Sequence, residues 1–399
     1  MAFDVARVRG LFPALGDGWV HLDGAATMQV PEQVAMAVAT ALRAPVSAPG
    51  GVFPSSQRGV AIVDAARRCV ADLVGVDPAG VVLGPGLAVL LARLADALGA
   101  GWMLGDEIVL SRLDQQANVA PWTRAAQRCG ATVRWAEVDI ETCELPSWQY
   151  DDLMSRRTRL VAVTAASSAV GTRPEVAHIA ERARSVGATV VVDASGAAPF
   201  VPLDVAAMGA DVVAVSGSAW GGPPVAALAF RDPRVLDRLP SCALDPNARG
   251  PERLELGPHP HALLAGLVAS VEYLAGLDDT AVGSRRERLL ASLGSVKAYQ
   301  AGLLSHLTGE LRALRHVTVL GDAMRRIPVM AFTVSGRKCW DVVEALAESG
   351  VCAFADAGHY DVFASLGVAE VGGAVQVGLA HYTTVAEVDA LVHAAARLR

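Results

Sequence analysis

Several short apolar runs of this 399-residue chain are followed by polar or glycine-rich segments. In open α/β sheets, ligands bind beyond the carboxyl ends of the strands, so these segments are the first candidates for chemistry. Asp193 directly follows three valines, and a carboxylate buried at a strand end needs a partner. Either a cationic ring or metal ion, or the cap of a neighbouring loop or helix, would satisfy it. The other strand-end segments are residues 84–86, 114–118, 166–168 and 216–219.

The chain is poor in groups that perform amine and metal chemistry. It contains two lysines, Lys297 and Lys338, so any reaction that needs an amine has few candidates. Six cysteines are scattered without a CxxC pair, which predicts buried free thiols in a reducing cytosol. Cys and His residues are not clustered at metal-ligand spacing, so no metal site is predicted.

The elements that position these residues alternate between β-branched runs and longer Ala-, Leu- and Arg-rich segments. Continuous apolar strands separated by helices indicate βαβ units, a mostly parallel sheet and helices on both faces. We therefore expect an α/β three-layer sandwich. The predicted strands are residues 80–83, 107–111, 132–138, 160–164, 189–193, 211–216 and 225–230, and the predicted helices are residues 87–98, 119–128 and 174–186.

The pattern changes after about residue 255, where long helices precede a few strands. This change predicts a smaller C-terminal α+β domain, formed by residues 256–399 together with residues 1–19, beside a large domain of residues 20–255. The predicted helices are residues 263–277, 285–314, 339–349 and 385–399, and the predicted strands are residues 317–320, 329–334 and 375–379.

Charge and hydropathy exclude several classes of function. The net charge is −7 and there is no basic run, so nucleic-acid binding is not expected. Mean hydropathy is high at +0.36, yet charged and proline residues interrupt the most apolar stretches, so no membrane span is expected. The N-terminus lacks the apolar core of a secretion signal, and we expect a cytoplasmic protein.

A series of motifs, taken in order, resembles the class V aminotransferase and cysteine desulfurase family. Each motif is weak alone, but together they span almost the whole chain. The resemblance implies the pyridoxal-phosphate-dependent transferase fold of type I, with a seven-stranded type of sheet, pyridoxal phosphate as cofactor and a homodimer. The motifs are His21-Leu22-Asp23-Gly24-Ala25-Ala26-Thr27, Val192-Asp193-Ala194, Gly209-Ala210-Asp211, Ser216-Gly217, Gly222-Pro223, Glu255-Leu256-Gly257 and His381-Tyr382-Thr383-Thr384.

The departures from the family pattern bear on function. The resemblance places the family's cofactor-binding lysine at Ala219, which has no nucleophile. It implies that Asp193 pairs with the ring nitrogen and that Ser216 helps hold the phosphate. It also places Gln115 at the position of the histidine that stacks on the ring, Ser168 at an asparagine that contacts the ring hydroxyl, and Ala88 at a phosphate-binding threonine.

The substrate side departs from the pattern as well. In one desulfurase branch an arginine binds the substrate carboxylate and a cysteine accepts sulfur. Asp356 and Asp361 stand at those positions, so the charge is reversed and the thiol is absent. His359, between them, is a candidate proton carrier.

Three functions remain open at this point. The first is a catalytically degenerate member of the family, because Ala219 excludes covalent binding of the cofactor. The second is an enzyme that holds pyridoxal or pyridoxamine phosphate non-covalently. The third is a scaffold that binds an unrelated ligand or a protein partner.

Overall fold

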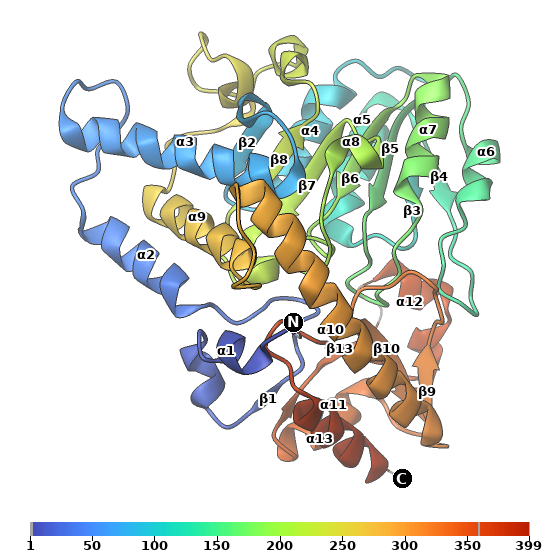
Figure 1. The fold of residues 1–399 in the computed structure, drawn as a ribbon. Helices are drawn as coiled ribbons and strands as arrows, with labels where there is room; N and C mark the ends of the chain where they lie inside the picture. The colour runs from blue at the N-terminus through green and yellow to red at the C-terminus, as the bar shows by residue number, and fades with distance from the viewer. Residues whose placement is uncertain (1–2, 358–359, 399) are drawn as a thin grey trace.

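A seven-stranded sheet forms the centre of the computed structural model, which describes residues 3–357 and 360–398 (Figure 1). The strand order is β2-β8-β7-β6-β5-β3-β4. Strands β7, β6, β5, β3 and β4 are parallel, whereas β8 runs antiparallel to both β7 and β2. The predicted mostly parallel sheet is therefore confirmed. Its strands are β2 (Val81–Gly84), β3 (Glu107–Ser111), β4 (Thr132–Ala136), β5 (Thr158–Thr164), β6 (Thr189–Asp193), β7 (Val212–Ser216) and β8 (Ala226–Phe230).

Helices cover both faces of this sheet, which gives the three expected layers (Figure 1). Successive side chains of a strand point to opposite faces. Along β6, Val190 and Val192 belong to the core beneath α3, α7, α9 and the first half of α10, while Val191 belongs to the core beneath α4 and α5. The helices are α3 (Pro54–Val74), α4 (Leu87–Gly99), α5 (Ala120–Cys129), α7 (Val176–Val186), α9 (His261–Ala275) and α10 (Arg285–Ala313), with short helices α6 (Tyr150–Leu153) and α8 (Val205–Met208) between strands.

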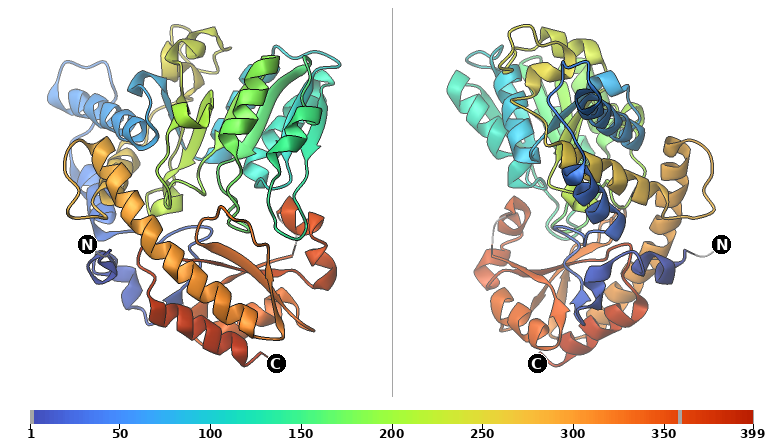
Figure 2. Two further views of the ribbon diagram at one scale, coloured as in Figure 1. Left: turned by 45° about the vertical axis from the view of Figure 1, so that its right-hand side comes forward. Right: turned by 90° about the vertical axis from the view of Figure 1, so that its left-hand side faces the viewer.

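A second, smaller sheet is entirely antiparallel and has the order β12-β13-β10-β9. Its core combines β10 and β13 with the second half of α10, through Leu303, Leu307 and Leu311. Helix α10 thus runs from the large sheet to the small one, as Figure 2 shows. The elements are β9 (Val317–Leu320), β10 (Val329–Val334), α11 (Cys339–Glu348), β11 (Val351–Cys352), β12 (Phe354–Asp356), α12 (Asp361–Ser365), β13 (Ala374–Gly378) and α13 (Val385–Ala396).

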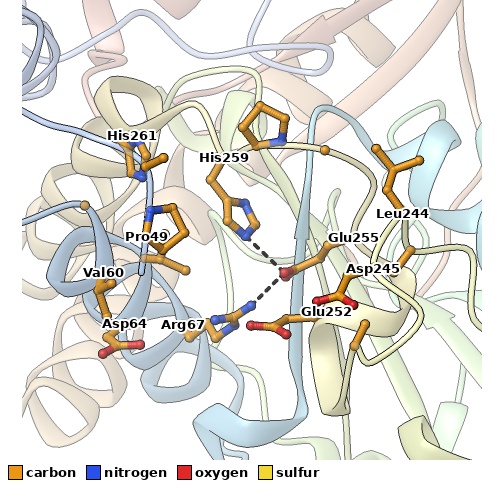
Figure 3. Close-up of a pocket in the computed structure, with 17 residues that line it drawn as sticks. Pro49, Val60, Asp64, Arg67, Leu244, Asp245, Glu252, Glu255, His259 and His261 are labelled. Atoms are coloured by element: carbon orange, nitrogen blue, oxygen red, sulfur yellow. Dashed lines mark hydrogen bonds and ion pairs between the residues drawn. The ribbon is translucent and has the colours of Figure 1, made fainter. Parts of the chain in front are cut away.

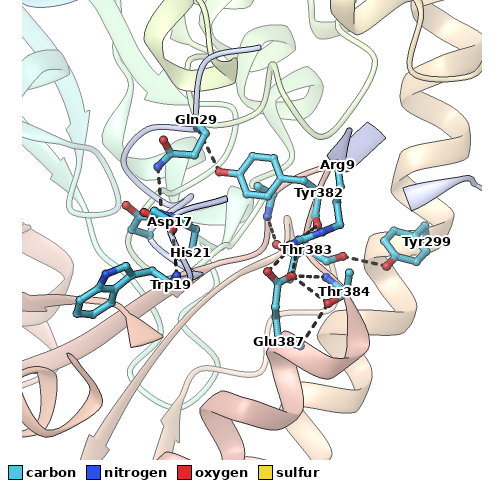
Figure 4. A network of polar contacts seen from close by, with 12 residues as sticks. Arg9, Asp17, Trp19, His21, Gln29, Tyr299, Tyr382, Thr383, Thr384 and Glu387 are labelled. Atoms are coloured by element: carbon cyan, nitrogen blue, oxygen red, sulfur yellow. Dashed lines mark hydrogen bonds and ion pairs between the residues drawn. The ribbon is translucent and has the colours of Figure 1, made fainter. Parts of the chain in front are cut away.

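The N-terminal segment is tied to the small sheet and its helices. Strand β1 (Val20–His21) pairs in parallel with β11, and α1 (Val5–Arg9) is linked through Arg9 to the first turn of α13. Arg9 donates to both carboxylate oxygens of Glu387 at 2.8 Å and to the Tyr382 carbonyl at 2.7 Å (Figure 4). The Tyr382 hydroxyl in turn accepts from the Gln29 backbone N–H at 3.1 Å. These bonds fix the start of the chain against its end.

The division into domains at residues 255 and 256 stays a prediction. Helix α9 follows that division in sequence, yet it packs against α2 (Glu32–Arg43) and α3 beside the large sheet. Sequence patterns gave no sign of α2, α3 or the short strands β11 and β12. Among the described residues, no helix combines the length and the apolarity needed to cross a bilayer.

Candidate functional site

Asp193 ends β6 and is buried, with 1% of its surface exposed. The Gln115 side-chain amide donates to Oδ2 of Asp193 at 2.6 Å, and the Ser195 backbone N–H donates to Oδ1 at 2.9 Å. Burial raises the pKa of the Asp193 carboxyl, and the bonds from Gln115 and Ser195 only partly oppose that rise. The contacts of Asp193 among the described residues are therefore with a loop N–H and a side-chain amide, as in the capping alternative.

A second buried carboxyl, Asp114, lies next to Asp193 and follows β3. It accepts hydrogen bonds from the Ser111 hydroxyl and from the Asn118 side-chain amide, the latter at 2.7 Å. The Trp122 indole N–H donates to Asn118 at 3.1 Å, which orients the Asn118 amide. Burial raises the pKa of Asp114 to about 7, and the nearby charge of Asp193 contributes. The sequence placed residues 114–118 among the strand-end candidates, but no pattern in it singled out Asp114 or its bond to Asn118.

The turn after β7 carries Ser216 and Ala219. Ser216 is the last residue of the strand, and its hydroxyl lies 3.1 Å from that of Ser218. Ala219 lies in the following 3-10 helix and is partly buried. Trp220 is fully buried, and its indole N–H donates to the Ser270 hydroxyl of α9 at 3.0 Å. Trp220 is therefore part of the core between the sheet and α9.

Neither lysine lies in this turn. Lys297 is exposed on α10, and Lys338 is exposed at the residue that precedes α11. Ala88, in the first turn of α4, is exposed and presents only a methyl group.

The small domain contributes Tyr360 and Asp361. The Ser168 hydroxyl lies 3.3 Å from the Tyr360 hydroxyl, and the Ser168 carbonyl accepts from Gln376 at 2.6 Å. Burial raises the pKa of Tyr360. Asp361 accepts from Arg112 at 3.2 Å and from Gln116 at 2.8 Å. Sequence reasoning missed Tyr360, because no local pattern brings it to the end of β5.

Asp356 is buried in β12. Gly358 and His359 lie outside the described residues, so the suggestion that His359 carries a proton stays a prediction. Among residues 3–357 and 360–398, no group of three or more His, Cys, Asp or Glu side chains is arranged to hold a metal ion.

A separate pocket of about 430 Å³ lies between α3 and the segment that precedes α9. Figure 3 shows Arg67 and His259 converging on the carboxylate of Glu255 there. Glu255 accepts from Arg67 at 2.7 Å, from the Leu83 backbone N–H at 2.8 Å and from His259 at 3.0 Å. Burial alone would raise the pKa of Glu255, but the bonds from His259 and the charge of Arg67 lower it. The motif residue Glu255 thus joins β2 to α3 and to the chain before α9.

The fold with its strand-end site is that of the pyridoxal-phosphate-dependent transferases of fold type I. Residues 20–391 match the aminotransferase class-V family, and the chain belongs to that family.

Its relatives include an uncharacterised protein of Mycobacterium tuberculosis, 52% identical over 100% of both chains. A probable cysteine desulfurase of Streptomyces coelicolor is 28% identical over 98% of this chain and 96% of the relative. Among solved structures, the cysteine desulfurase CsdA of Escherichia coli has a TM-score of 0.86 at 27% identity, covering 100% of this chain and 99% of that one.

The residues of the strand-end site do not fit a covalently held pyridoxal phosphate. The turn after β7 offers the methyl group of Ala219 in place of an amine. Both carboxylate oxygens of Asp193 already accept hydrogen bonds, from the Gln115 side chain and from the Ser195 N–H.

Proposed function

We propose that this chain is a class-V family member that no longer performs the lysine-dependent chemistry of the family and instead serves as a binding scaffold. The observation that carries the proposal is Ala219, which occupies the turn where the resemblance requires an amine. A second supports it: the two lysines of the chain are exposed on other elements. A third is the bond from Gln115 to Asp193, which satisfies the carboxylate without a cofactor.

We further propose that the scaffold is a cytoplasmic homodimer. Exposed apolar side chains along α2 and the segment between α2 and α3 support an interface there, including Leu42 at 72% and Val52 at 93% exposure. The six cysteines are free, but the prediction that they are buried is wrong for Cys242, which is exposed, and for Cys129 and Cys352, which are partly exposed. An exposed free thiol is compatible with a reducing compartment. Light scattering after gel filtration tests the dimer, and a Leu42→Glu variant that runs as the same dimer as the parent would place the interface elsewhere.

The function itself is tested by incubating the purified chain with pyridoxal phosphate, reducing it with borohydride and mapping modified peptides by mass spectrometry. The expected result is no stoichiometric adduct on the parent chain. Ala219→Lys restores an amine at the turn and is the matched gain-of-function variant. Val282→Lys places a lysine at an exposed site and measures non-specific modification.

Each outcome decides between the candidates. A stoichiometric adduct on Lys297 or Lys338 of the parent chain would refute the proposal and restore a lysine-dependent enzyme. Saturable binding without an adduct would favour the alternative, an enzyme that holds the cofactor non-covalently through Asp193 and Ser216. An adduct confined to the variant at Ala219 would support both the register of the resemblance and the loss of chemistry in the parent.

A further inference from the structure

A cleft of about 800 Å³ runs along α10, and it is separate from the strand-end site. Asp193 follows Val191 in the alternation of β6 and therefore points toward the face covered by α4 and α5. The cleft lies on the other face, where α10 packs. Its walls come from α10, from residues 322–328 before β10, and from Arg173, Phe200 and Val201 of the loops that follow β5 and β6.

The lining of this cleft is strongly cationic, although the whole chain has a net charge of −7. One acidic side chain, Asp322, stands among the lining residues, and it pairs with Arg312 at 2.9 Å. Arg325 pairs with Glu175 at 3.2 Å, outside the cleft. The five cationic residues of the lining are Arg173, Lys297, Arg312, Arg325 and Arg326.

Three of these cations have no carboxylate partner within the part of the chain that the structure describes. No hydrogen bond or ion pair engages the side chains of Arg173 and Lys297. Arg326 donates through Nη2 to two backbone carbonyls at 3.3 Å, and its buried Nε has no acceptor. The Nε of Arg173 is likewise buried without an acceptor. Buried donors of charged groups are normally satisfied, so these two N–H groups are available to a ligand oxygen in the cleft.

Backbone hydrogen bonds join the two segments that carry Arg173, Arg325 and Arg326. The loop after β5 and the chain before β10 form a short antiparallel contact, in which Arg173 N–H donates to the Arg325 carbonyl at 2.8 Å and Ile327 N–H donates to the Gly171 carbonyl at 2.9 Å. This contact sets Arg173 beside Arg325. Burial lowers the pKa of Arg173, and the charge of Arg325 lowers it further. An anion that binds between Arg173 and Arg325 would reduce the repulsion between their positive charges.

We propose that this cleft binds a small organic anion with at least two oxyanion groups, phosphate or carboxylate, held by Arg173, Lys297 and Arg326. Guanidinium groups bind both kinds of oxyanion in bidentate fashion. The volume suits a small molecule, since ligand pockets typically measure about 300–1,000 Å³. The aliphatic side chains of Ala301 and Leu304 on α10 offer a surface for its carbon skeleton. This site is independent of the function proposed above.

The test is isothermal titration of the full-length chain at low ionic strength with pyrophosphate and, separately, with citrate. Saturable binding that weakens as salt is added is expected for at least one of them. The anion that binds more tightly identifies phosphate or carboxylate as the preferred group. Arg173→Gln and Lys297→Gln are each expected to weaken binding about tenfold or more, the loss typical of one charge-assisted hydrogen bond.

Arg156→Gln is the matched control, because it removes the same charge from an exposed residue that precedes β5, at the opposite end of that strand from Arg173. It should leave the affinity unchanged. Lys297 is exposed on a helix surface, so its variant is expected to fold even if the Arg173 variant does not. The proposal is overturned if neither anion binds the parent chain, or if Arg156→Gln weakens binding as much as Lys297→Gln does.

Discussion

Replacing Asp114 by asparagine removes a carboxyl that lies beyond the end of β3 with 1% of its surface exposed. Its pKa is raised to about 7 from an ordinary value of 3.8. In the folded chain the carboxyl therefore keeps its proton over a range in which the unfolded chain has lost it. The protonated carboxyl contributes its full stability below the pKa of the unfolded chain, and this contribution is lost as pH rises through the pKa of the folded chain.

The size of the effect follows from the linkage relation. Each pH unit between the two pKa values changes the free energy of unfolding by about 1.36 kcal/mol. From about pH 5 to about pH 7, the parent chain should therefore lose about 2 kcal/mol through this group, with little further change up to about pH 8. The asparagine variant should not show this loss. It should carry only a constant penalty of about 1 kcal/mol. The NH2 group of the new side chain cannot accept a hydrogen bond, so one of the two bonds from Ser111 and Asn118 must be replaced by a bond that the new amide donates.

The assay is denaturant unfolding of both chains at about pH 5 and about pH 8. Asp152→Asn removes an exposed carboxylate and controls for the change in net charge. The difference in unfolding free energy between the Asp114 variant and the parent should move in favour of the variant as pH rises. A difference that stays constant between the two pH values would refute the reasoning, and with it the picture of a protonated carboxyl beside Asp193.

Three further changes test the packing around the site. Arg67→Met removes one partner of the buried Glu255, which keeps its bonds from the Leu83 N–H and from His259, and should cost about 1–3 kcal/mol at neutral pH. Because the pKa of Glu255 is lowered in the fold, the cost seen in denaturant titrations should shrink as pH falls toward that pKa. Gly171→Ala should lower the thermal midpoint sharply, since φ is +80° and the added Cβ would lie 2.4 Å from the Val329 carbonyl oxygen; an unchanged midpoint would contradict the close contact. Trp220→Phe should cost about 1–3 kcal/mol in chemical unfolding, because it leaves a buried hydroxyl of α9 without its donor and removes core volume.

The strands of the large sheet could be predicted from the sequence because each is a continuous apolar run between turn residues. β6, for example, is three valines bounded by Thr189 and Asp193. Helices α2 and α3 could not be predicted in the same way: α3 mixes polar residues with small apolar ones over 21 residues. The two-residue strands β1 and β11 form only because they pair with each other from distant parts of the chain, so the local sequence carries no signal for them.

Only those residues of the candidate site that lie at or just after a strand of the large sheet could be predicted from the sequence. Asp193, Ser216 and Gln115 lie at strand ends, where the sequence placed them, but their roles toward a cofactor stay predictions. The contact of Ser168 with Tyr360 joins positions 192 residues apart. The cationic cleft joins Arg173, Lys297 and Arg326 from three separate elements. Such contacts depend on how the two sheets sit against α10, which periodicity and spacing do not encode.

The pair Gln115 and Asp193 suggests how a strand-end carboxylate persists in a chain without the expected lysine. A buried carboxylate without donors would cost several kcal/mol, so Asp193 needs hydrogen-bond donors within the fold. The Gln115 amide supplies one donor and Ser195 N–H another. Burial also raises the pKa of Asp114, to about 7, so below that pH its carboxyl holds a proton and adds little negative charge to the interior beside Asp193. The Asp193 carboxylate is therefore satisfied by donors from within the chain, which is what the proposed binding scaffold requires.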